Sequence, residues 1–329
     1  MKSIIILYPI GVKKGAPAYQ RISSFVNFYK KNNIKVIFKY TPNSFYSRIK
    51  LIKFMYKNKV FNIFISMPPF RNWTFFLIPY INLILDIRDG WSIAIKTGYG
   101  NTVKPKKIKS FFARQIEKIA IYRSHLSITC TNGLQEYLRK LSSKDILLIT
   151  NGYNENDSKI VESYSHSVKS PNKRNEKVAV CVGKFSEYGV DKVKTILFRL
   201  NREKVLVKLI GSNFEQNKWI FSFLKKHQLK NISLEILPRL DRKLMYIEIL
   251  KSDYGLSILR DPNYDFGTKV YDYILCQKPI LNYFDKDNNF TIFFKKFLDS
   301  YEYSSSSNKS FLREKLILEH RVSLIKALK

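Results

Sequence analysis

Acidic residues are scarce in this chain, and residues 1–85 contain none at all. The 329 residues include 58 Lys and Arg against 26 Asp and Glu, a formal net charge of +32 at pH 7. Such a charge says something about the partners of a protein and nothing about its fold. It points to phosphorylated small molecules, an anionic membrane surface or nucleic acid, met mainly by the first half of the chain.

Cysteine is equally scarce. Only Cys130, Cys181 and Cys276 are present, and they lie far apart in apolar runs. An odd number of cysteines without metal-type spacing argues against a disulfide framework and against a zinc site. The pattern indicates small, reduced core residues in a reducing compartment. The four histidines are just as scattered, so none of them is singled out as a catalytic base.

Long hydrophobic runs are missing too. The longest apolar stretch, residues 75–87, is interrupted by Pro79, Asn82 and Asp86. It falls short of the ~20 residues that a membrane-spanning helix needs. The apolar run at residues 4–7 ends at Pro9 and has no cleavage site after it, which favours a buried first strand over a signal sequence. The sequence therefore predicts a cytoplasmic protein.

Short, β-branched apolar runs alternate with longer helical patterns along both halves of the chain. This alternation is typical of βαβ units and a parallel sheet. The expected helices are 18–31, 110–123, 134–141, 190–201, 216–227, 243–251 and 268–276. The expected strands are 3–8, 35–40, 60–66, 83–87, 126–130 and 146–149, then 178–182, 205–210, 232–237, 254–258 and 280–283.

The predicted fold class is therefore α/β, with two Rossmann-like domains whose parallel sheets face each other across a cleft. The first domain is expected at residues 1–155 and the second at residues 172–304. Residues 154–177, rich in Ser, Asn, Lys and Glu, have the composition of a linker. Residues 309–329 have a helical period and are expected to pack back on the first domain.

The loops that follow the strands are where ligands bind in parallel sheets. After the first strand, Gly11 and Gly15 allow close backbone approach ahead of a helix, whose free amides attract anions. Their spacing is not that of a dinucleotide fingerprint, and an ordinary turn explains it equally well. In the second half a strand ends at Gly183, and Lys184 is placed to neutralise a diphosphate.

Residues 265–279 form the most informative segment. Gly267 and Thr268 predict the start of a helix, with Thr268 as its cap. Asp272 lies one turn further on, on the face of Lys269. Helix-end amides beside a carboxylate can hold a phosphate and a ribose together. A capped helix without a ligand remains the alternative.

Several segments together resemble the motifs of GT-B glycosyltransferases of the GT4 type. The segment TKVYDY at 268–273, followed by KPIL at 278–281, resembles the nucleotide-sugar signature of that family. The resemblance continues, in the same order and spacing, in LDIRDGW at 85–91, ITNGYN at 149–154, VGKFS at 182–186, LIGS at 209–212 and SDYGLSIL at 252–259. It covers nearly the whole chain.

The resemblance implies a donor site on the second domain and an acceptor site on the first. Asp272 would bind the ribose, and Gly267, Thr268 and Lys269 would bind the diphosphate. Residues implied as catalytic are Asp89, Lys184, Lys269 and Asp272. Further residues implied at the donor are Gly15, Gly183, Lys184, Gly211, Arg239, Leu240 and Val270. Those implied at the acceptor are Lys14, Gly15, Ala16, Arg88 and Asp89.

The implied reaction is transfer of a sugar from a UDP- or GDP-sugar to a lipid-linked glycan in surface polysaccharide synthesis, such as lipopolysaccharide or capsule. Retention of configuration is implied, without metal or cofactor. The DxD-like Asp285 and Asp287 carry little weight, since they lie late in an Asn-rich turn. We expect peripheral binding of the basic first domain to the inner membrane face, through an amphipathic helix at 44–59, and no binding of nucleic acid.

One departure from the family pattern keeps alternatives open. Eight positions before Asp272, where the family has an acid, this chain has Tyr264, so that Asp261 or Asp265 replaces the acid or it is missing. A non-catalytic partner subunit of the same fold is therefore one alternative. A basic nucleic-acid-binding protein is another, favoured by the charge and by the many Tyr and Phe residues.

Overall fold

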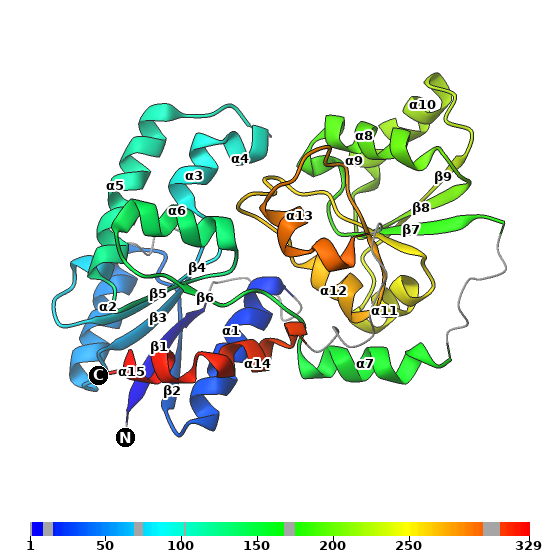
Figure 1. Ribbon diagram of the computed structural model, residues 1–329. Coiled ribbons are helices and arrows are strands. Elements are labelled where there is room, and N and C mark those ends of the chain that lie inside the picture. Colours follow the sequence, from blue (N-terminus) through cyan, green and yellow to red (C-terminus); the bar gives the residue numbers. More distant parts are fainter. Residues whose placement is uncertain (1, 9–15, 69–74, 102, 168–174, 299–309) are drawn as a thin grey trace. The chain divides into compact units, whose positions relative to one another are not determined.

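The computed structural model describes residues 2–8, 16–68, 75–101, 103–167, 175–298 and 310–329. Its contacts divide the chain into two compact units (Figure 1). The first comprises Met1–Tyr99, Pro105–Asn154 and Leu312–Lys329, and the second Gly100–Lys104 and Glu155–Phe311. Each unit is built on a parallel sheet, which confirms the predicted α/β class.

The first unit contains a six-stranded sheet in the order β2-β1-β3-β4-β5-β6, in which every neighbouring pair is parallel. β3 and β4 are buried along their whole length, as is usual for strands covered on both faces. The strands are β1 (Ser3–Tyr8), β2 (Lys35–Tyr40), β3 (Asn62–Met67), β4 (Asn82–Ile87), β5 (Leu126–Thr129) and β6 (Leu147–Leu148).

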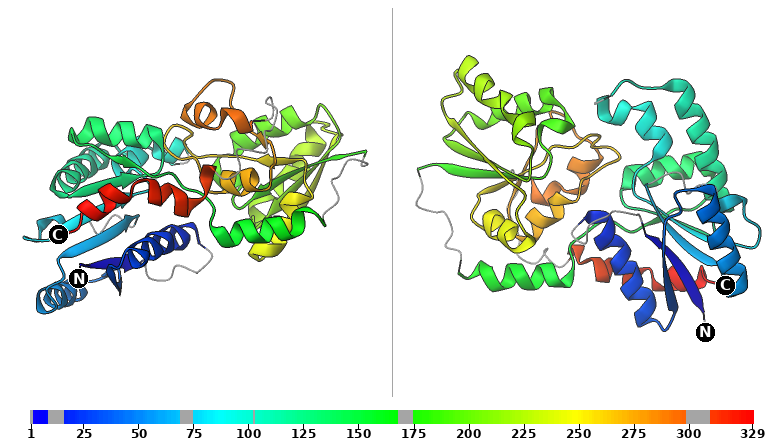
Figure 2. Two further views of the ribbon diagram at one scale, coloured as in Figure 1. Left: turned by 60° about the horizontal axis from the view of Figure 1, so that its bottom comes forward. Right: turned by 180° about the vertical axis from the view of Figure 1, so that it is seen from behind.

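Helices α1 and α14 pack against each other and, with α15, contribute apolar side chains to one core with strand residues such as Ile4, Phe64 and Ile84 (Figures 1 and 2). Helices α3 and α6 both pack on α5. The helices of this unit are α1 (Pro17–Lys31), α2 (Phe45–Lys57), α3 (Trp91–Lys96), α5 (Lys107–Arg123), α6 (Asn132–Ser142), α14 (Arg313–Glu319) and α15 (Arg321–Lys326), and α4 (Gly98–Asn101) lies at its border.

The end of the chain is tied to the first sheet by polar contacts as well. The Lys2 ammonium donates to the carbonyl of Leu328 at 2.6 Å, and the Asn62 amide donates to that of Lys329 at 3.1 Å. The periodicity of 309–329 suggested one helix, but the structure has two, α14 and α15, which meet at His320. Residues 312–329 thus complete the unit that begins the chain.

The second unit contains a five-stranded sheet in the order β11-β10-β7-β8-β9, again parallel throughout. Its strands are β7 (Lys177–Val182), β8 (Val205–Ile210), β9 (Ile232–Leu237), β10 (Tyr254–Leu256) and β11 (Ile280–Leu281). Its helices are α7 (Glu155–Ser165), η2 (Ser186–Tyr188), α8 (Val190–Leu200), α9 (Phe214–Asn217), α10 (Trp219–Lys226), α11 (Arg242–Leu250), α12 (Lys269–Leu275), α13 (Asn289–Phe293) and η3 (Lys295–Phe297).

Two expectations about the second half are wrong. The linker expected at 154–177 begins with the helix α7, which buries Asp157 and Val161. The helix was not predicted from the polar composition of the segment, because only a narrow stripe of α7 packs against the rest of the second unit. The helix expected at 216–227 is divided into α9 and α10 at Lys218, since the Asn213 side chain caps α9 and starts it early.

No helix among the described residues combines the length and the apolar character that crossing a membrane would require.

Candidate functional site

The carboxyl ends of β7, β8 and β9 lie side by side in the second sheet. Gly183 follows β7 with φ of 96°, and Gly211 follows β8 with φ of 78°, conformations that favour glycine. The Ser212 hydroxyl donates to the Gly183 carbonyl, and a Cβ on Gly211 would lie 3.6 Å from Cα of Arg239. The structure therefore brings Gly183, Gly211 and Arg239 to one edge.

There is free space beside the main chain at the end of β7. A Cβ added to Gly183 would meet no atom within 4 Å. The next residue, Lys184, and the more distant Arg239 are exposed, and Leu240 is half-buried. Free space beside main-chain amides, together with exposed cations, suits the binding of an anionic ligand.

Helix α12, which carries Asp272, is anchored at the same edge. The hydroxyl of Tyr273 accepts a hydrogen bond from the Val182 amide at 2.9 Å and donates to the Leu256 carbonyl at 3.2 Å. Asp272, which precedes Tyr273, is thereby held near the ends of β10 and β7, close to Gly183, which follows Val182.

Asp272 is almost fully buried, at 4% exposure, and both carboxylate oxygens are engaged. Oδ1 accepts from the Tyr246 hydroxyl at 2.8 Å and from Nη2 of Arg242 at 3.3 Å. Oδ2 accepts from the Lys269 ammonium at 3.1 Å. Lys269 is the more exposed partner, with about a third of its side chain accessible, at 34%. The structure thus pairs the two central residues of the predicted donor site.

Arg242 ties this cluster to another helix. Its guanidinium meets both carboxylate oxygens of Asp157 on α7, with 2.6 Å between Nη2 and Oδ2, and Nη2 lies 2.9 Å from the Tyr246 hydroxyl. Asp157 is fully buried. Two carboxylates and two cations thus form one neutral chain of contacts, from Asp157 through Arg242 and Asp272 to Lys269.

The charges set the protonation states of the cluster. Burial raises the pKa of Asp272, but Lys269 and Arg242, with the Tyr246 hydrogen bond, outweigh it, so that the pKa lies below its usual range. Burial, aided by the Asp272 charge, raises the pKa of Tyr246 well above its usual value. At neutral pH the site therefore holds an ionised carboxylate beside a protonated phenol.

Arg242, Tyr246 and Asp157 were not among the predicted site residues. Arg242 and Tyr246 are one turn apart on α11, a spacing visible in the sequence. Nothing in the sequence shows that this face meets Asp272, which is 30 residues beyond Arg242.

The turn before α12 differs from the expectation in detail. The helix begins at Lys269 with Thr268 in the cap position, but the Thr268 side chain makes no capping hydrogen bond, so the predicted cap is wrong in its mechanism. The Gly267 amide donates to Oδ1 of Asp265 at 2.8 Å. Val270 is buried, so its side chain is directed into the unit.

The candidate replacements for the missing family acid both serve the loop after β10. Asp265 closes the turn at Gly267, and Asp261 accepts the Asn263 amide at 3.2 Å. Both carboxylates interact electrostatically with Lys192 on α8. The Lys192 ammonium donates to the carbonyls of Leu259 at 2.9 Å and Arg260 at 2.7 Å. Burial lowers the pKa of Lys192, although both carboxylates counteract it. Lys192 thus holds this loop against α8, a role that its sequence position did not reveal.

Both carboxylates of the DxD-like pair contact side chains of this protein. Asp285 pairs with Arg199, and Asp287 accepts from the Thr291 hydroxyl at 3.3 Å. Across the described residues, no group of three or more Asp, Glu, His or Cys side chains is arranged to hold a metal ion.

In the first unit, a buried ion pair lies under the predicted acceptor loop. Arg21 contacts Asp86 through Nη2 at 2.7 Å, and both side chains are at most 1% exposed. The Ser66 hydroxyl also donates to Asp86, at 2.7 Å. Asp86, the first acid of the family-like loop, is therefore a structural group that holds β4 to α1 and β3.

Arg88 and Asp89 follow at the carboxyl end of β4. Arg88 donates to the Ser66 hydroxyl at 3.0 Å and to the Pro68 carbonyl at 2.9 Å, which commits part of its guanidinium to the loop. Asp89 is exposed. Ala16 is the residue before α1, while Lys14 and Gly15 lie outside the described residues.

Glu117 closes the helix end next to this loop. Its buried carboxylate accepts the amides of Trp91 at 3.0 Å and Ser92 at 3.3 Å, the first of α3. Burial raises its pKa, although the Ser92 and Trp91 hydrogen bonds oppose this. The anion-binding end of α3 is thus filled by the chain itself.

The chain is similar along its length to several solved structures. Sucrose-phosphate synthase from Thermosynechococcus elongatus has a TM-score of 0.58 at 11% identity, over 85% of this chain and 80% of that one. Anabaena HepE with UDP and glucose has a TM-score of 0.56 at 12% identity, over 99% and 97%. A glycosyltransferase from Rickettsia africae has 0.52 at 12%, over 100% and 94%. The fold is GT-B.

Identities this low establish the fold alone. No protein-family model matches the sequence, and none of the curated proteins matches it either. The GT-B fold confirms the fold implied by the motifs. The roles of individual residues depend on the geometry described above.

Proposed function

We propose that this protein is a glycosyltransferase of the GT4 type that transfers a sugar from a nucleoside diphosphate sugar. The observation that carries this proposal is the buried, ionised Asp272 paired with the accessible Lys269 at the carboxyl edge of the second sheet. A carboxylate that accepts ribose hydroxyls beside a cation that meets phosphate matches the two halves of such a donor.

The proposed donor contacts assign one role to each of the residues at this edge. Asp272 Oδ2, which has Lys269 as its partner, is the oxygen that would accept a ribose hydroxyl. Lys269 and Lys184 meet the diphosphate, with the main chain at Gly183, Gly211, Gly267, Thr268 and Val270. Arg239 and Leu240 border the base. HepE of similar fold has been solved with UDP-glucose, and we propose a UDP- or GDP-sugar here.

The proposed chemistry is a substitution at the anomeric carbon. The bond to the diphosphate oxygen breaks, the bond to the acceptor oxygen forms, and the acceptor proton passes to the departing diphosphate. Lys184 and Lys269 stabilise the negative charge that develops on this leaving group. Retention of configuration is part of the proposal and is supported by the family-like motifs.

The proposed acceptor is a lipid-linked glycan of a surface polysaccharide, such as lipopolysaccharide or capsule. Ala16, Arg88 and Asp89, with Lys14 and Gly15, are the candidates for binding it, and Asp89 is an accessible carboxylate that could meet the acceptor hydroxyl. A basic first unit suits a reaction at the inner face of a membrane, since each basic residue near such a surface contributes ~1 kcal/mol.

Thermal unfolding with nucleotides tests the donor site. UDP, GDP, CMP and their common sugars are added with and without Mg²⁺. A ligand that binds only the folded state stabilises it by about 2.7 kcal/mol at a hundredfold excess over its Kd. We expect one diphosphate to raise Tm regardless of Mg²⁺, and Asp272→Asn to abolish the rise. Asp191→Asn, a change at an exposed carboxylate of α8, is the matched control.

If no nucleotide shifts Tm, the donor site is wrong, and the absence of the first family acid at Tyr264 then favours a non-catalytic partner subunit. Binding of generic DNA or RNA that weakens steeply with salt would instead favour the nucleic-acid alternative.

A further inference from the structure

Helix α5 of the first unit has an unusual outward face. Its buried face carries mostly small or polar residues: Ser110, Ala113, Glu117, Ala120 and Ile121. Five bulky apolar residues lie on the other face and are at least 48% exposed: Ile108, Phe111, Phe112, Ile119 and Tyr122. A surface helix normally has the opposite arrangement.

The exposed residues form one continuous stripe. Phe111, Phe112, Ile119 and Tyr122 follow Ile108 by three, four, eleven and fourteen positions, which are neighbouring places on one side of an α-helix. The rings of Phe111 and Phe112 meet edge to face at 5.8 Å between centroids. Contiguous exposed apolar surface of this kind marks an interaction site rather than chance exposure.

Cations flank the stripe. Each is exposed, and among the described residues none of them forms an ion pair: Lys106, Lys107, Lys109, Arg114, Lys118 and Arg123. The helix has one acid, Glu117, which is buried on its opposite face against the start of α3. The outward face is therefore both apolar and uniformly positive.

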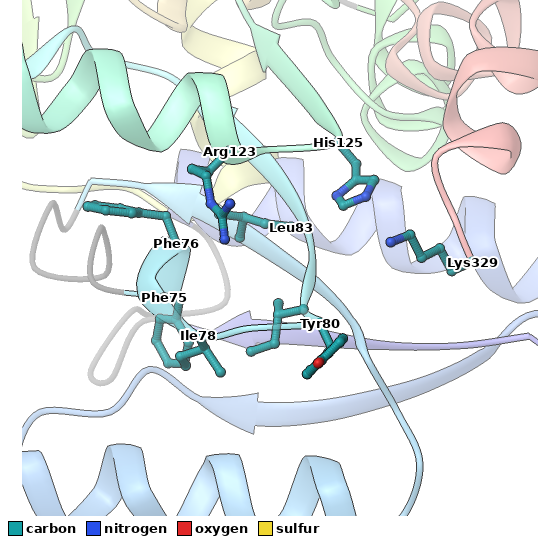
Figure 3. Close-up of a pocket in the computed structure, with 9 residues that line it drawn as sticks. Phe75, Phe76, Ile78, Tyr80, Leu83, Arg123, His125 and Lys329 are labelled. Atoms are coloured by element: carbon teal, nitrogen blue, oxygen red, sulfur yellow. The ribbon is translucent and has the colours of Figure 1, made fainter.

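A pocket of about 260 Å³ lies at the end of α5, where Arg123, one of the flanking cations, lines it. Figure 3 shows Arg123, His125 and Lys329 on one side of it and Phe75, Ile78 and Tyr80 on the other. Leu77, next to the pocket-lining Phe76, is 68% exposed and Tyr80 82%. Apolar and aromatic side chains line this pocket together with the cations Arg123 and Lys329, a mixture that suits a group that is anionic at one end and hydrocarbon at the other.

We propose that the outward face of α5 and this pocket dock the first unit on a bilayer of anionic phospholipid. Apolar side chains enter the boundary between headgroups and acyl chains, while Lys and Arg reach the phosphates. Charge complementarity selects this occupant over a second copy of the chain, since two identical faces would oppose cation to cation. A nucleic acid would contact the cations but would leave the apolar stripe exposed to water, which favours a bilayer as the partner.

This inference relocates the membrane contact proposed above. Segment 44–59 forms α2, where Phe45 and Tyr46 are exposed but the apolar stripe at Leu51 and Met55 is buried. The inference rests on the proposed function in one respect, the lipid-linked acceptor that would bring the protein to a membrane.

Flotation of the full chain with vesicles tests the docking face, without any nucleotide. Vesicles of phosphatidylcholine alone are compared with vesicles that also contain phosphatidylglycerol. We expect binding to the anionic vesicles only, and Phe111→Ser with Phe112→Ser to weaken it at least about tenfold. The matched control is Phe214→Ser with Phe221→Ser, a pair at least 45% exposed in the second unit.

A second pair of variants tests the charge. Replacing Lys107, Lys109, Arg114 and Lys118 by Gln should weaken binding to anionic vesicles at least about tenfold and reduce its salt dependence. The same change at Arg202, Lys225, Lys226 and Lys230 of the second unit should weaken it less.

Equal binding to both kinds of vesicle, equal loss in both sets of variants, or competition by glycerol phosphate as strong as by vesicles would overturn the proposal. So would a dimer that Phe111→Ser with Phe112→Ser dissociates while vesicle binding is absent. The nucleotide-induced rise in Tm, measured on the same variants, reports on folding and on the donor site separately. A failed docking face and a failed donor site are thus distinguishable.

Discussion

Asp272 depends on its neighbours for its charge. A carboxylate at 4% exposure would be protonated or expelled without them, and here Arg242, Lys269 and Tyr246 supply the compensating contacts. Arg242 serves two buried acids at once, since it also pairs with Asp157. The proposed donor site and the stability of the second unit therefore share one residue.

Replacing Arg242 by Met should destabilise the protein by about 3–5 kcal/mol, because two buried carboxylates lose their shared partner. Urea unfolding measures this. Lys194→Met on α8, a change at a half-exposed side chain, is the control and should change the free energy of unfolding by less than about 0.5 kcal/mol.

The pH dependence gives a second readout of the same variant. The pKa of Asp272 is lowered in the folded protein, so its stabilising contribution is present above the unfolded value near ~4 and is lost as the pH falls through the lower folded value. The difference between wild type and Arg242→Met should therefore shrink below about pH 4. A constant difference down to pH 3 would show that Arg242 acts by packing alone.

At the scale of single residues, the sequence singled out two members of the charged cluster, Lys269 and Asp272, and missed Asp157, Arg242 and Tyr246. Lys269 and Asp272 are three positions apart on one helix, and such local pairs are readable from spacing. Asp157 lies 85 residues before Arg242, and their contact requires the spatial order of α7 and α11, which no local pattern contains.

At the scale of elements, α12 is fitted to the end of the sheet through Tyr273. Gly255 in β10 leaves room for the ring, since a Cβ there would lie 2.3 Å from it. This close approach, rather than a special backbone angle, explains the glycine within a strand.

We expect Gly255→Ala to destabilise the second unit by about 1–3 kcal/mol through overpacking. In a double-mutant cycle, Tyr273→Leu should relieve part of this cost, so that the two changes together cost less than their sum. Strict additivity, measured by urea unfolding, would refute the contact.

Strands were easier to predict than helices in this chain. β1, β2, β8 and β9 agree with the expected bounds, because their apolar, β-branched runs are bounded by polar residues. α7 escaped prediction because a helix that buries two residues has hardly any apolar period. The outward face of α5 escaped for the opposite reason: its apolar period is clear, but it does not face the core.

At the scale of the whole molecule, the two parallel sheets and the GT-B fold followed from alternation and from the ordered motifs. The first unit is discontinuous, since Leu312–Lys329 belongs to it. Ile317 and Leu324 are fully buried in the same core as Ile22, Phe25 and Ile84.

Ile317→Ala should therefore cost about 2–5 kcal/mol in the free energy of unfolding. Its neighbour Leu318 is 55% exposed on the same helix, and Leu318→Ala should cost less than about 0.5 kcal/mol. Equal costs for the two variants would mean that α14 is not part of the core.

The discontinuity also fixes an order of events during synthesis. The six strands of the first sheet leave the ribosome before residues 155–311 of the second unit, whereas α14 and α15, which contribute to one core of that sheet, leave it after them. The second unit can reach its native state while the nascent chain is still attached. The first unit keeps Ile22, Phe25 and their neighbours without their final cover until residues 312–329 have been synthesised, so this uncovered core is the part of the nascent chain with most need of a chaperone.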